Sequence, residues 1–244
     1  MRLISPTVFV TGANRGLGYE FVRQFLLRGD RVYAGCRVPE TAHELHQLTE
    51  RFGERLIVVP LDLAQPDSIE AARRIVGETT DTLDILVNNA GTFATGERGL
   101  FCLDAEKIAH VFAVNAIAPA LVAQQFAPLL ERGNTPLVAN LTSGVGVLSD
   151  RVGEAGGQYG YAASKAALNH VIRSLSFDLL PLGVTVIGIA PGYVQTDMTR
   201  GGTATLLPEE SVSGMITVFD RMTIADTGRF FNYTNREDSW MMPG

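Results

Sequence analysis

Short apolar runs alternate along the chain with longer stretches of helical periodicity. Runs that are apolar throughout are typical of strands buried on both faces of a parallel sheet. The pattern predicts strands at Thr7–Thr11, Arg31–Gly35, Leu56–Pro60, Leu83–Val87, Pro136–Leu141 and Val184–Ile189. Stretches with one apolar face predict helices, at Leu17–Leu27, Glu40–Phe52, Asp67–Thr79, Asp104–Phe112, Pro119–Glu131 and Tyr161–Leu180.

The last part of the chain is less periodic. It predicts a helix after Pro208 and a short apolar segment at Arg229–Tyr233. Alternation of strand and helix gives, through right-handed crossovers, an open, doubly wound parallel sheet. We therefore expect an α/β fold of three layers, α/β/α, with helices on both faces of the sheet. No linker interrupts the pattern, so residues 1–244 are predicted to form a single domain.

Composition narrows the class of protein. The net charge is −6 and no basic cluster offers a surface for nucleic acid. Two cysteines, Cys36 and Cys102, are too few for a disulfide framework and fit a reducing compartment. The N-terminal apolar run lacks a cleavage-site pattern, and no run of about 20 apolar residues suggests a transmembrane helix. We expect a cytoplasmic protein with neither nucleic acid nor membrane as partner.

A glycine-rich turn follows the first predicted strand and opens the first helix. Glycine lets the backbone approach a pyrophosphate closely, and the helix N-terminus supplies free N–H groups and a positive dipole end. The spacing G-x-x-x-G-x-G differs from the common G-x-G-x-x-G, and such a turn can be a purely structural bend. Its place in a βα series favours dinucleotide binding. The predicted contacts are Gly12, Asn14, Arg15, Gly16, Leu17 and Gly18.

The end of the second strand distinguishes the two nicotinamide cofactors. A site for NAD places Asp or Glu there to bind the ribose 2′-hydroxyl. Here the strand is followed by Cys36 and Arg37, while Asp30 precedes it. Arg37 and Arg15 could each bond a 2′-phosphate in bidentate fashion. Two solvated surface arginines are the alternative. The sequence favours NADP(H).

Further motifs stand in a recognisable order. They are TGANRGLG at Thr11–Gly18, NNAG at Asn88–Gly91, Asn115, Ser143, YAASK at Tyr161–Lys165 and Pro191-Gly192. With this ordered set the chain resembles the short-chain dehydrogenase/reductase family. The resemblance implies a Rossmann-type sheet and the catalytic set Asn115, Ser143, Tyr161 and Lys165. Within the family, Gly156–Tyr161 and Pro208–Val212 most resemble the C-factor and sniffer-like carbonyl reductases.

The chemistry of the tyrosine can be argued from the residues themselves. Hydride transfer to a carbonyl leaves an alkoxide-like oxygen that needs a proton. Tyrosine titrates near pKa ~10, too high for easy exchange at neutral pH. Lys165 lies one helical turn after Tyr161, on the same face, and its charge should lower the tyrosine pKa. Tyr159 has Ala163 at that position. The alternative is a half-buried ring with a snorkelling lysine.

Ser143 follows the fifth strand, at the edge where such sheets bind ligands, and its hydroxyl could orient the carbonyl oxygen. Thr142 is the adjacent alternative, and either residue could only cap a turn. The resemblance implies that Lys165 also holds the nicotinamide ribose and that Asn115 supports a water leading protons to Lys165. The connection 144–160 is longer and richer in glycine than in many members, which suggests a distinctive rim.

The remaining cofactor contacts come from the resemblance alone. Asp62 and Leu63 would lie beside the adenine. Asn89, Ala90 and Gly91 would lie under the cofactor, although NNAG could equally be a turn that ends a strand. The loop that holds the nicotinamide would comprise Pro191, Gly192, Val194 and Thr196. No metal is predicted, because His43 and His46 lack the H-E-x-x-H spacing.

Substrate choice should come from the loops at the same edge, Thr92–Leu103, Gly144–Gly160 and Tyr193–Pro208, the last a mobile lid around 193–208. We expect reduction of a reactive aldehyde or ketone, a small-molecule carbonyl, with Tyr161 as general acid. Oxidation of a secondary alcohol and a non-catalytic NADP(H)-binding regulator are the alternatives. The resemblance is compatible with a homodimer or homotetramer through the helix at Tyr161–Leu180, and a monomer stays open.

Overall fold

The computed structural model describes residues 5–96, 99–148, 158–199 and 202–237. One parallel sheet runs through these residues, with strand order β3-β2-β1-β4-β5-β6-β7. The strands are β1 Thr7–Thr11, β2 Arg31–Cys36, β3 Leu56–Pro60, β4 Ile85–Asn88, β5 Leu137–Leu141, β6 Thr185–Ala190 and β7 Phe230–Asn232. The parallel sheet confirms the predicted fold class. The apolar segment near the C-terminus adds the seventh strand, β7.

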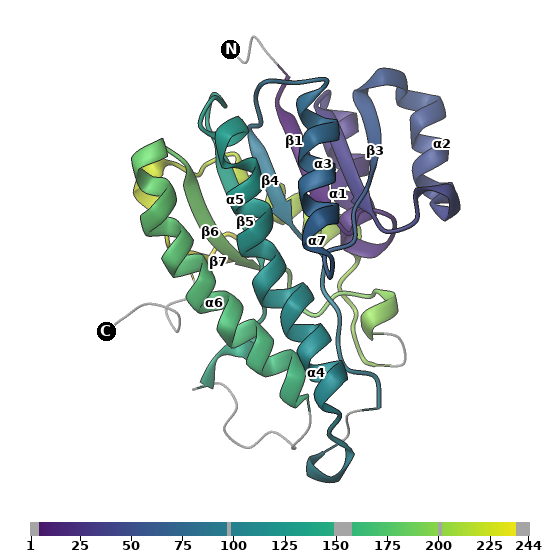
Figure 1. The fold of residues 1–244 in the computed structure, drawn as a ribbon, viewed down its shortest axis with the longest axis vertical. Coiled ribbons are helices and arrows are strands. Elements are labelled where there is room, and N and C mark those ends of the chain that lie inside the picture. Colours follow the sequence, from purple (N-terminus) through teal and green to yellow (C-terminus); the bar gives the residue numbers. More distant parts are fainter. Residues whose placement is uncertain (1–4, 97–98, 149–157, 200–201, 238–244) are drawn as a thin grey trace.

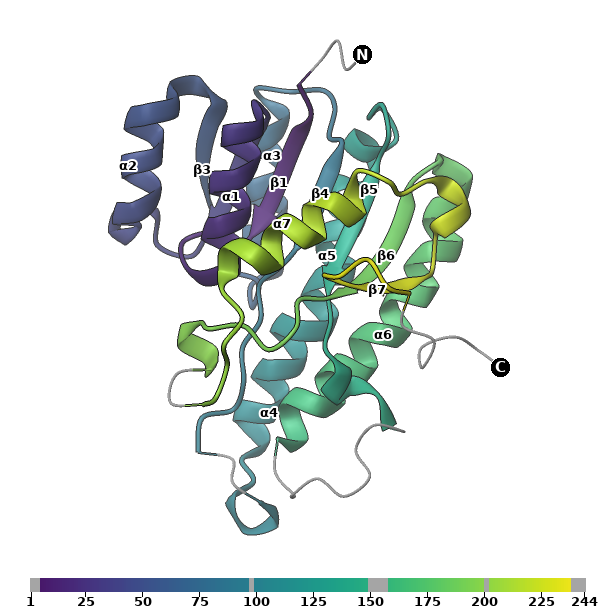
Figure 2. The same cartoon turned by 180° about the vertical axis from the view of Figure 1, so that it is seen from behind.

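Helices cover both faces of the sheet. They are α1 Gly16–Arg28, α2 His43–Phe52, α3 Pro66–Gly77, α4 Ala105–Phe112, α5 Ala118–Leu130, α6 Tyr159–Leu179 and α7 Pro208–Phe219. Helices α3, α5 and α6 lie on one face (Figure 1), and α1 and α7 lie on the other (Figure 2). Because both faces are covered, the central strands are buried along their whole length, which explains their continuous apolar runs.

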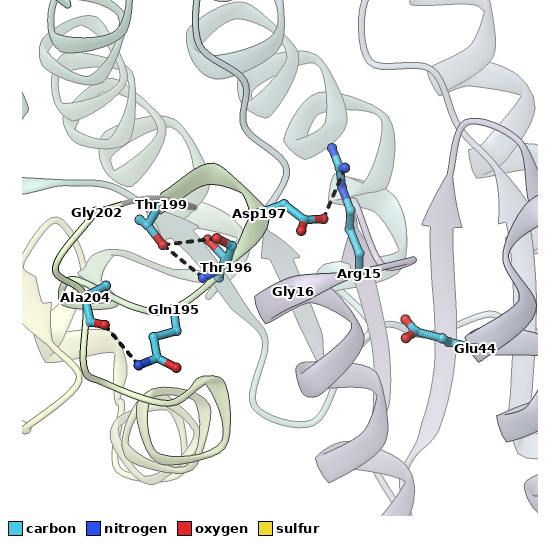
Figure 3. A pocket seen from close by; sticks show the side chains of 9 residues that line it. All are labelled: Arg15, Gly16, Glu44, Gln195, Thr196, Asp197, Thr199, Gly202 and Ala204. Atoms are coloured by element: carbon cyan, nitrogen blue, oxygen red, sulfur yellow. Dashed lines mark hydrogen bonds and ion pairs between the residues drawn. The ribbon is translucent and has the colours of Figure 1, made fainter.

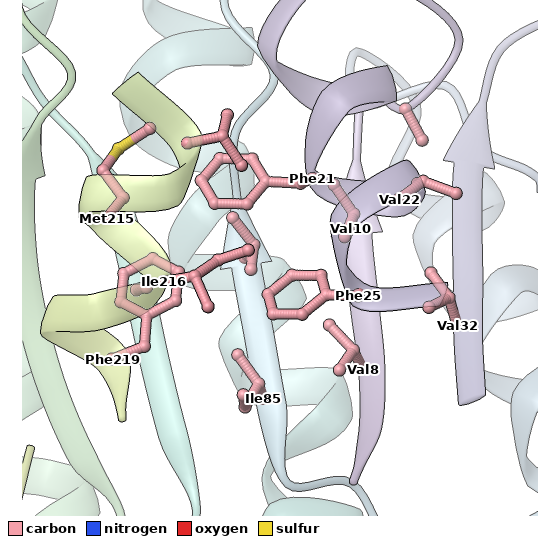
Figure 4. Packing of buried hydrophobic residues seen from close by; sticks show 14 of the residues in the cluster. Val8, Val10, Phe21, Val22, Phe25, Val32, Ile85, Met215, Ile216 and Phe219 are labelled. Atoms are coloured by element: carbon pink, nitrogen blue, oxygen red, sulfur yellow. The ribbon is translucent and has the colours of Figure 1, made fainter. Parts of the chain in front are cut away.

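The core on the α1 and α7 face is built around aromatic rings. Phe21 stacks against Phe25 of the same helix and against Phe219 of α7, each with ring centroids 5.9 Å apart (Figure 4). Val8 and Val10 of β1 lie beneath these rings. Such ring pairs stabilise a core beyond the area that they bury. They hold α1, and with it the glycine turn, against the sheet.

Helices α4 and α5 are continuous, although the sequence predicted two separate helices ending at Phe112 and beginning at Pro119. A π-helical turn at Ala113–Ile117 joins them. Pro119 has no N–H to donate to the carbonyl of Asn115, so a regular α-helical turn cannot be completed there. The wider turn solves this without ending the helix. Turns of this kind often occur at functional sites, and this one carries Asn115.

The joined helix Ala105–Leu130 is long and apolar enough to cross a membrane by length and composition. In its most apolar window 56% of the residues are buried inside the fold. Val122 and Phe126 belong to the core on the α3, α5 and α6 face. A core helix therefore meets the same criterion, and the expectation of no membrane partner stays a prediction.

Candidate active site and cofactor-binding site

The glycine turn between β1 and α1 depends on its glycines. Gly12 and Gly16 have φ of +64° and +55°, in the region that favours glycine. A Cβ on Gly18 would lie 2.1 Å from the carbonyl oxygen of Gly12. The N-cap residue of α1, Arg15, makes no capping hydrogen bond through its side chain. The first N–H groups of α1 are therefore left without a side-chain acceptor, as an anion site requires.

The NNAG turn after β4 is tied to the glycine turn. The side-chain amide of Asn89 donates to the carbonyls of Thr11 and Gly12, at 2.8 and 3.2 Å. The hydroxyl of Thr11 accepts from the backbone N–H groups of Asn89 and Ala90, both at 3.1 Å. The turn thus ends β4 and also fixes the backbone of the glycine turn, so the two interpretations of NNAG are compatible.

The two predicted phosphate ligands stand at neighbouring strand ends. The N–H of Ala13 donates to the carbonyl of Gly35 at 3.0 Å, which draws the glycine turn to the end of β2. Arg37 follows that strand and is exposed. Arg15 contacts Asp197 at 3.5 Å, with both side chains more than half exposed. An ion pair this open is weak, so Arg15 stays available to another anion.

A pocket of about 540 Å³ opens beside Arg15 (Figure 3). It is lined by Arg15, Gly16, Glu44, Gln195, Thr196, Asp197, Thr199, Gly202 and Ala204. It lies between the glycine turn and the segment after β6, and Thr196 is 3.6 Å from the position of a Cβ on Gly16. Three predicted cofactor residues, Arg15, Gly16 and Thr196, line this pocket, and none of the four predicted catalytic residues does.

Tyr161 and Lys165 lie one turn apart on α6 at the carboxyl end of the sheet. The ammonium of Lys165 donates to the carbonyl of Leu141 at 2.7 Å and lies 5.8 Å from the centroid of the Tyr161 ring. Only 4% of Lys165 is exposed, and burial lowers its pKa to about 8.

The net shift in the pKa of Tyr161 is opposite to the direction expected from the Lys165 charge. Burial raises the pKa of Tyr161, and a hydrogen bond with Ser143 offsets part of that rise. The phenolate loses its hydration inside the fold, and the lysine charge is directed toward the Leu141 carbonyl. Tyr161 is therefore held in its protonated form at neutral pH.

The structure separates the two candidate hydroxyls after β5. Ser143 lies close enough to Tyr161 to lower its pKa, and its hydroxyl accepts from the N–H of Val145 at 3.4 Å. The hydroxyl of Thr142 instead donates to the side-chain oxygen of Asn169 on α6. Of the two adjacent hydroxyls, that of Ser143 lies beside Tyr161 and that of Thr142 is bonded to Asn169, so the structure favours Ser143.

Asn115 is buried and its amide is fully engaged. Its oxygen accepts from the N–H of Thr92 at 2.8 Å, and its nitrogen donates to the carbonyl of Thr92 at 2.8 Å and to the hydroxyl of Ser164 at 3.0 Å. Ser164 in turn donates to the carbonyl of Tyr161 at 2.7 Å. A Cβ on Gly91 would lie 3.6 Å from the Asn115 oxygen and 3.9 Å from the Lys165 nitrogen.

The four predicted catalytic residues therefore come together at one edge of the sheet, from α4–α5, β5 and α6. Residues 6–206 also match the family model described as short chain dehydrogenase. The chain belongs to the short-chain dehydrogenase family.

Individual relatives refine this likeness. The C-signal protein of Myxococcus xanthus is 41% identical over 165 residues, which are 66% of this chain and 95% of that protein. An NADPH-bound carbonyl reductase from chicken fatty liver superposes with a TM-score of 0.89 at 33% identity, covering 97% of this chain and 99% of that one. The carbonyl reductase Sniffer of D. melanogaster gives 0.87 at 27% identity, with coverage of 96% and 99%. These likenesses agree with the predicted subgroup.

Three residues of this short-chain dehydrogenase site escaped the sequence analysis. They are Gly146, Ser164 and Asn169. A Cβ on Gly146 would lie 2.7 Å from the backbone carbon of Lys165, so the turn after Ser143 rests directly on α6. Gly146 stands in the glycine-rich stretch that the sequence had marked, and Ser164 directly precedes Lys165. Asn169 gave no signal beyond its helical spacing.

The remaining predicted cofactor residues lie along the same edge. The carboxylate of Asp62 accepts from the N–H of Ala64 at 3.0 Å in the turn after β3 that also contains Leu63. Gly192 has φ of +82°, and Val194 is buried in a bridge to Leu206. Pro191, Asn14 and Leu17 complete this set in the loop after β6 and in the glycine turn.

Parts of the three predicted substrate loops lie outside the described residues, namely 97–98, 149–157 and 200–201. Tyr159, the rival tyrosine, begins α6 and is 43% exposed. Within the described residues, no group of three potential metal ligands is found.

Proposed function

We propose that this chain is an NADPH-dependent carbonyl reductase that reduces a reactive aldehyde or ketone, with Tyr161 as general acid. One observation carries the proposal: Ser143, Tyr161 and the buried Lys165 come together, with the Lys165 nitrogen 5.8 Å from the centroid of the Tyr161 ring and Ser143 close enough to lower the tyrosine pKa. Burial raises the pKa of this tyrosine. A reductase needs its acid protonated before hydride arrives, as Tyr161 is at neutral pH, and the Lys165 charge is then needed to stabilise the phenolate that proton transfer leaves.

The residues present fit a dinucleotide phosphate. The uncapped start of α1 would receive the pyrophosphate, and Arg15 and Arg37 the 2′-phosphate. Asp62 and Leu63 would lie by the adenine. The nicotinamide half would be held by Asn89, Ala90, Gly91, Lys165, Pro191, Gly192, Val194 and Thr196. The bound cofactor supplies the hydride.

The chain's own residues manage the proton. The hydroxyls of Ser143 and Tyr161 would donate to the substrate oxygen and stabilise the charge that develops on it. Tyr161 then gives up its proton, and the charge of Lys165 stabilises the resulting phenolate. Asn115 fixes the backbone at Thr92 and, through Ser164, the first turn of α6. Asn115 thereby holds the helical turn that carries Tyr161 and Lys165 in a fixed position.

The first test is consumption of NADPH and NADH with reactive aldehydes, ketones and α-diketones. We expect turnover with NADPH that disappears in Tyr161→Phe and persists in the matched control Tyr159→Phe. Arg15→Gln and Arg37→Gln should each weaken NADPH binding and leave NADH binding unchanged. A preference of the wild-type protein for NADH would contradict the roles of both arginines.

A regulatory role is the second candidate, because a relative of this chain carries the name C-signal. A regulator would bind NADP(H) and need no proton donor. Tight NADPH binding with no turnover on any carbonyl, and a biological output unchanged in Tyr161→Phe, would favour this role over the reductase.

A further inference from the structure

Three consecutive residues at the end of β5 each contact α6. The carbonyl of Leu141 accepts from Lys165 at 2.7 Å, the hydroxyl of Thr142 donates to Asn169, and Ser143 lies close enough to Tyr161 to lower its pKa. The outer two contacts hold residues assigned above to proton transfer. The middle contact does not touch the reacting groups and has no part in the mechanism so far.

The helix partners of these contacts share one face. Tyr161, Lys165 and Asn169 are spaced by four residues, so their side chains form a row along α6. The row places the contact between Thr142 and Asn169 one turn beyond Lys165 along α6, so Lys165 lies between it and Tyr161. The contact between Thr142 and Asn169 is therefore the second one, after that between Leu141 and Lys165, that joins the end of β5 to α6. Two such contacts fix both the distance and the orientation of the strand end relative to the helix.

Thr142 is suited to such a role because it is tied to the sheet and buried. Its N–H donates to the carbonyl of Ile189 in β6 at 2.9 Å, and only 3% of the residue is exposed. A buried hydroxyl without a partner is costly. The contact with Asn169 satisfies it, and separation of β5 from α6 would break that bond.

We infer that Thr142 and Asn169 are a positioning pair that holds the end of β5 at the distance from α6 at which Ser143 meets Tyr161. The inference rests on the proposed function. The pair acts through Ser143 and contacts neither substrate nor cofactor.

The test removes each partner with a side chain of similar size. Thr142→Val and Asn169→Leu should each lower kcat about 10-fold, since small displacements of reacting groups slow chemistry strongly. NADPH affinity should stay within about twofold, and Thr142→Ser should restore kcat. Thr79→Val is the matched control, because Thr79 contacts the hydroxyl of Tyr33 at 2.7 Å, far from the site.

A double-mutant cycle separates positioning from folding. In a Ser143→Ala background, Thr142→Val should have little further effect, because the contact through which it acts is already gone. An equal loss of kcat in both backgrounds, or wild-type kcat in Thr142→Val, would overturn the inference. Asn169→Leu provides the same test from the partly exposed helix side if Thr142→Val does not fold.

A second readout needs no turnover. Alkaline titration of Tyr161, followed by ultraviolet absorbance against Tyr161→Phe, should show a higher pKa in Thr142→Val, because the bond from Ser143 lowers it. An unchanged titration would contradict the inference. If the wild-type protein reduces no carbonyl, the proposed function fails, while this titration still decides whether the pair positions Ser143.

Discussion

Two buried charged side chains, Asp84 and Lys165, lie at opposite ends of the sheet and differ in how well the surrounding groups satisfy their hydrogen bonds. Asp84, 5% exposed at the amino end, accepts from the N–H groups of Thr7 and Asn134, each at 2.8 Å. Lys165, 4% exposed at the carboxyl end, has three donors and is given one acceptor by the described residues, the carbonyl of Leu141. Asp84 is satisfied by the backbone that it joins. Lys165 is not.

The difference indicates that burial of Lys165 lowers the stability of the fold at the carboxyl end of the sheet, where the proposed reaction takes place. Asp84 connects the start of β1 to the segment before β5 through hydrogen bonds, so it contributes to folding. Burial lowers the pKa of Lys165 from 10.5 to about 8, a cost of about 3 kcal/mol when the charged form is kept at neutral pH. We therefore expect changes at the two ends to have opposite effects on activity and stability.

The largest effect is expected at Lys165. Lys165→Met should lower kcat by about 10³-fold, because the phenolate of Tyr161 loses its stabilising charge. The same change should raise the free energy of unfolding at pH 7, by at most about 3 kcal/mol. Steady-state kinetics and denaturant unfolding measure the two quantities. Lys107→Met, at the exposed other lysine, should change neither, and a destabilised Lys165→Met protein would refute the comparison.

A pair of glycines offers the next test. A Cβ on Gly146 would lie 2.7 Å from the α6 backbone, and one on Gly133 would lie 2.3 Å from the carbonyl of Leu83 at the amino end. Gly146→Ala should lower kcat about 100-fold by pushing the turn after Ser143 off the helix. Gly133→Ala should lower only the thermal midpoint. Equal losses of kcat in the two variants would mean that the ends are not functionally distinct.

Asp84→Asn should lower the free energy of unfolding by about 1–3 kcal/mol, since an amide nitrogen would face a backbone N–H that now has a carboxylate oxygen. The kcat of the folded fraction should stay at the wild-type value. Urea unfolding monitored by circular dichroism gives the first quantity. A loss of kcat without a loss of stability would assign Asp84 a role in the site.

The smallest effect is a matter of pH. The reduction rate should be level up to about pH 8 and then fall, because Lys165 loses its proton above its pKa. Stability should move the other way: between about pH 8 and 10.5 the unfolded lysine keeps a proton that the folded one has released, so unfolding becomes less favourable as pH rises. In rate profiles and unfolding curves over this range, the reduction rate should fall while the free energy of unfolding rises. If both quantities rose or fell together, the role assigned to Lys165 would be contradicted.

The sequence located what depends on local spacing and on strand ends. Tyr161 and Lys165 were found because one helical turn separates them, and Ser143 because it ends a strand. The direction of the Tyr161 pKa was missed, because burial outweighs a neighbouring charge and depends on the whole fold. The contact between Arg15 and Asp197 joins residues 182 positions apart, which no local pattern reveals.

The helix boundaries show a related limit. Proline is typical of a helix boundary. The sequence therefore predicted that one helix ends at Phe112 and that the next begins at Pro119. Whether such a break ends a helix or only widens a turn depends on the contacts that the helix makes in the fold. Here the side chain of Asn88 donates to the carbonyl of Pro119 at 3.3 Å, a contact from β4 that only the folded chain provides.

The π-helical turn at Ala113–Ile117 also makes this helix sensitive to its length. Such a turn contains one residue more than the regular helix would, so deleting a single residue there would convert it to an ordinary turn. Because the wider turn accommodates the extra residue, the helix on either side would keep its facing, while the residues inside the turn, Asn115 among them, would lose their positions. Families that keep the activity should then tolerate substitutions in this segment better than deletions, and a gap at this point of a homologous sequence would mark a protein with a different site.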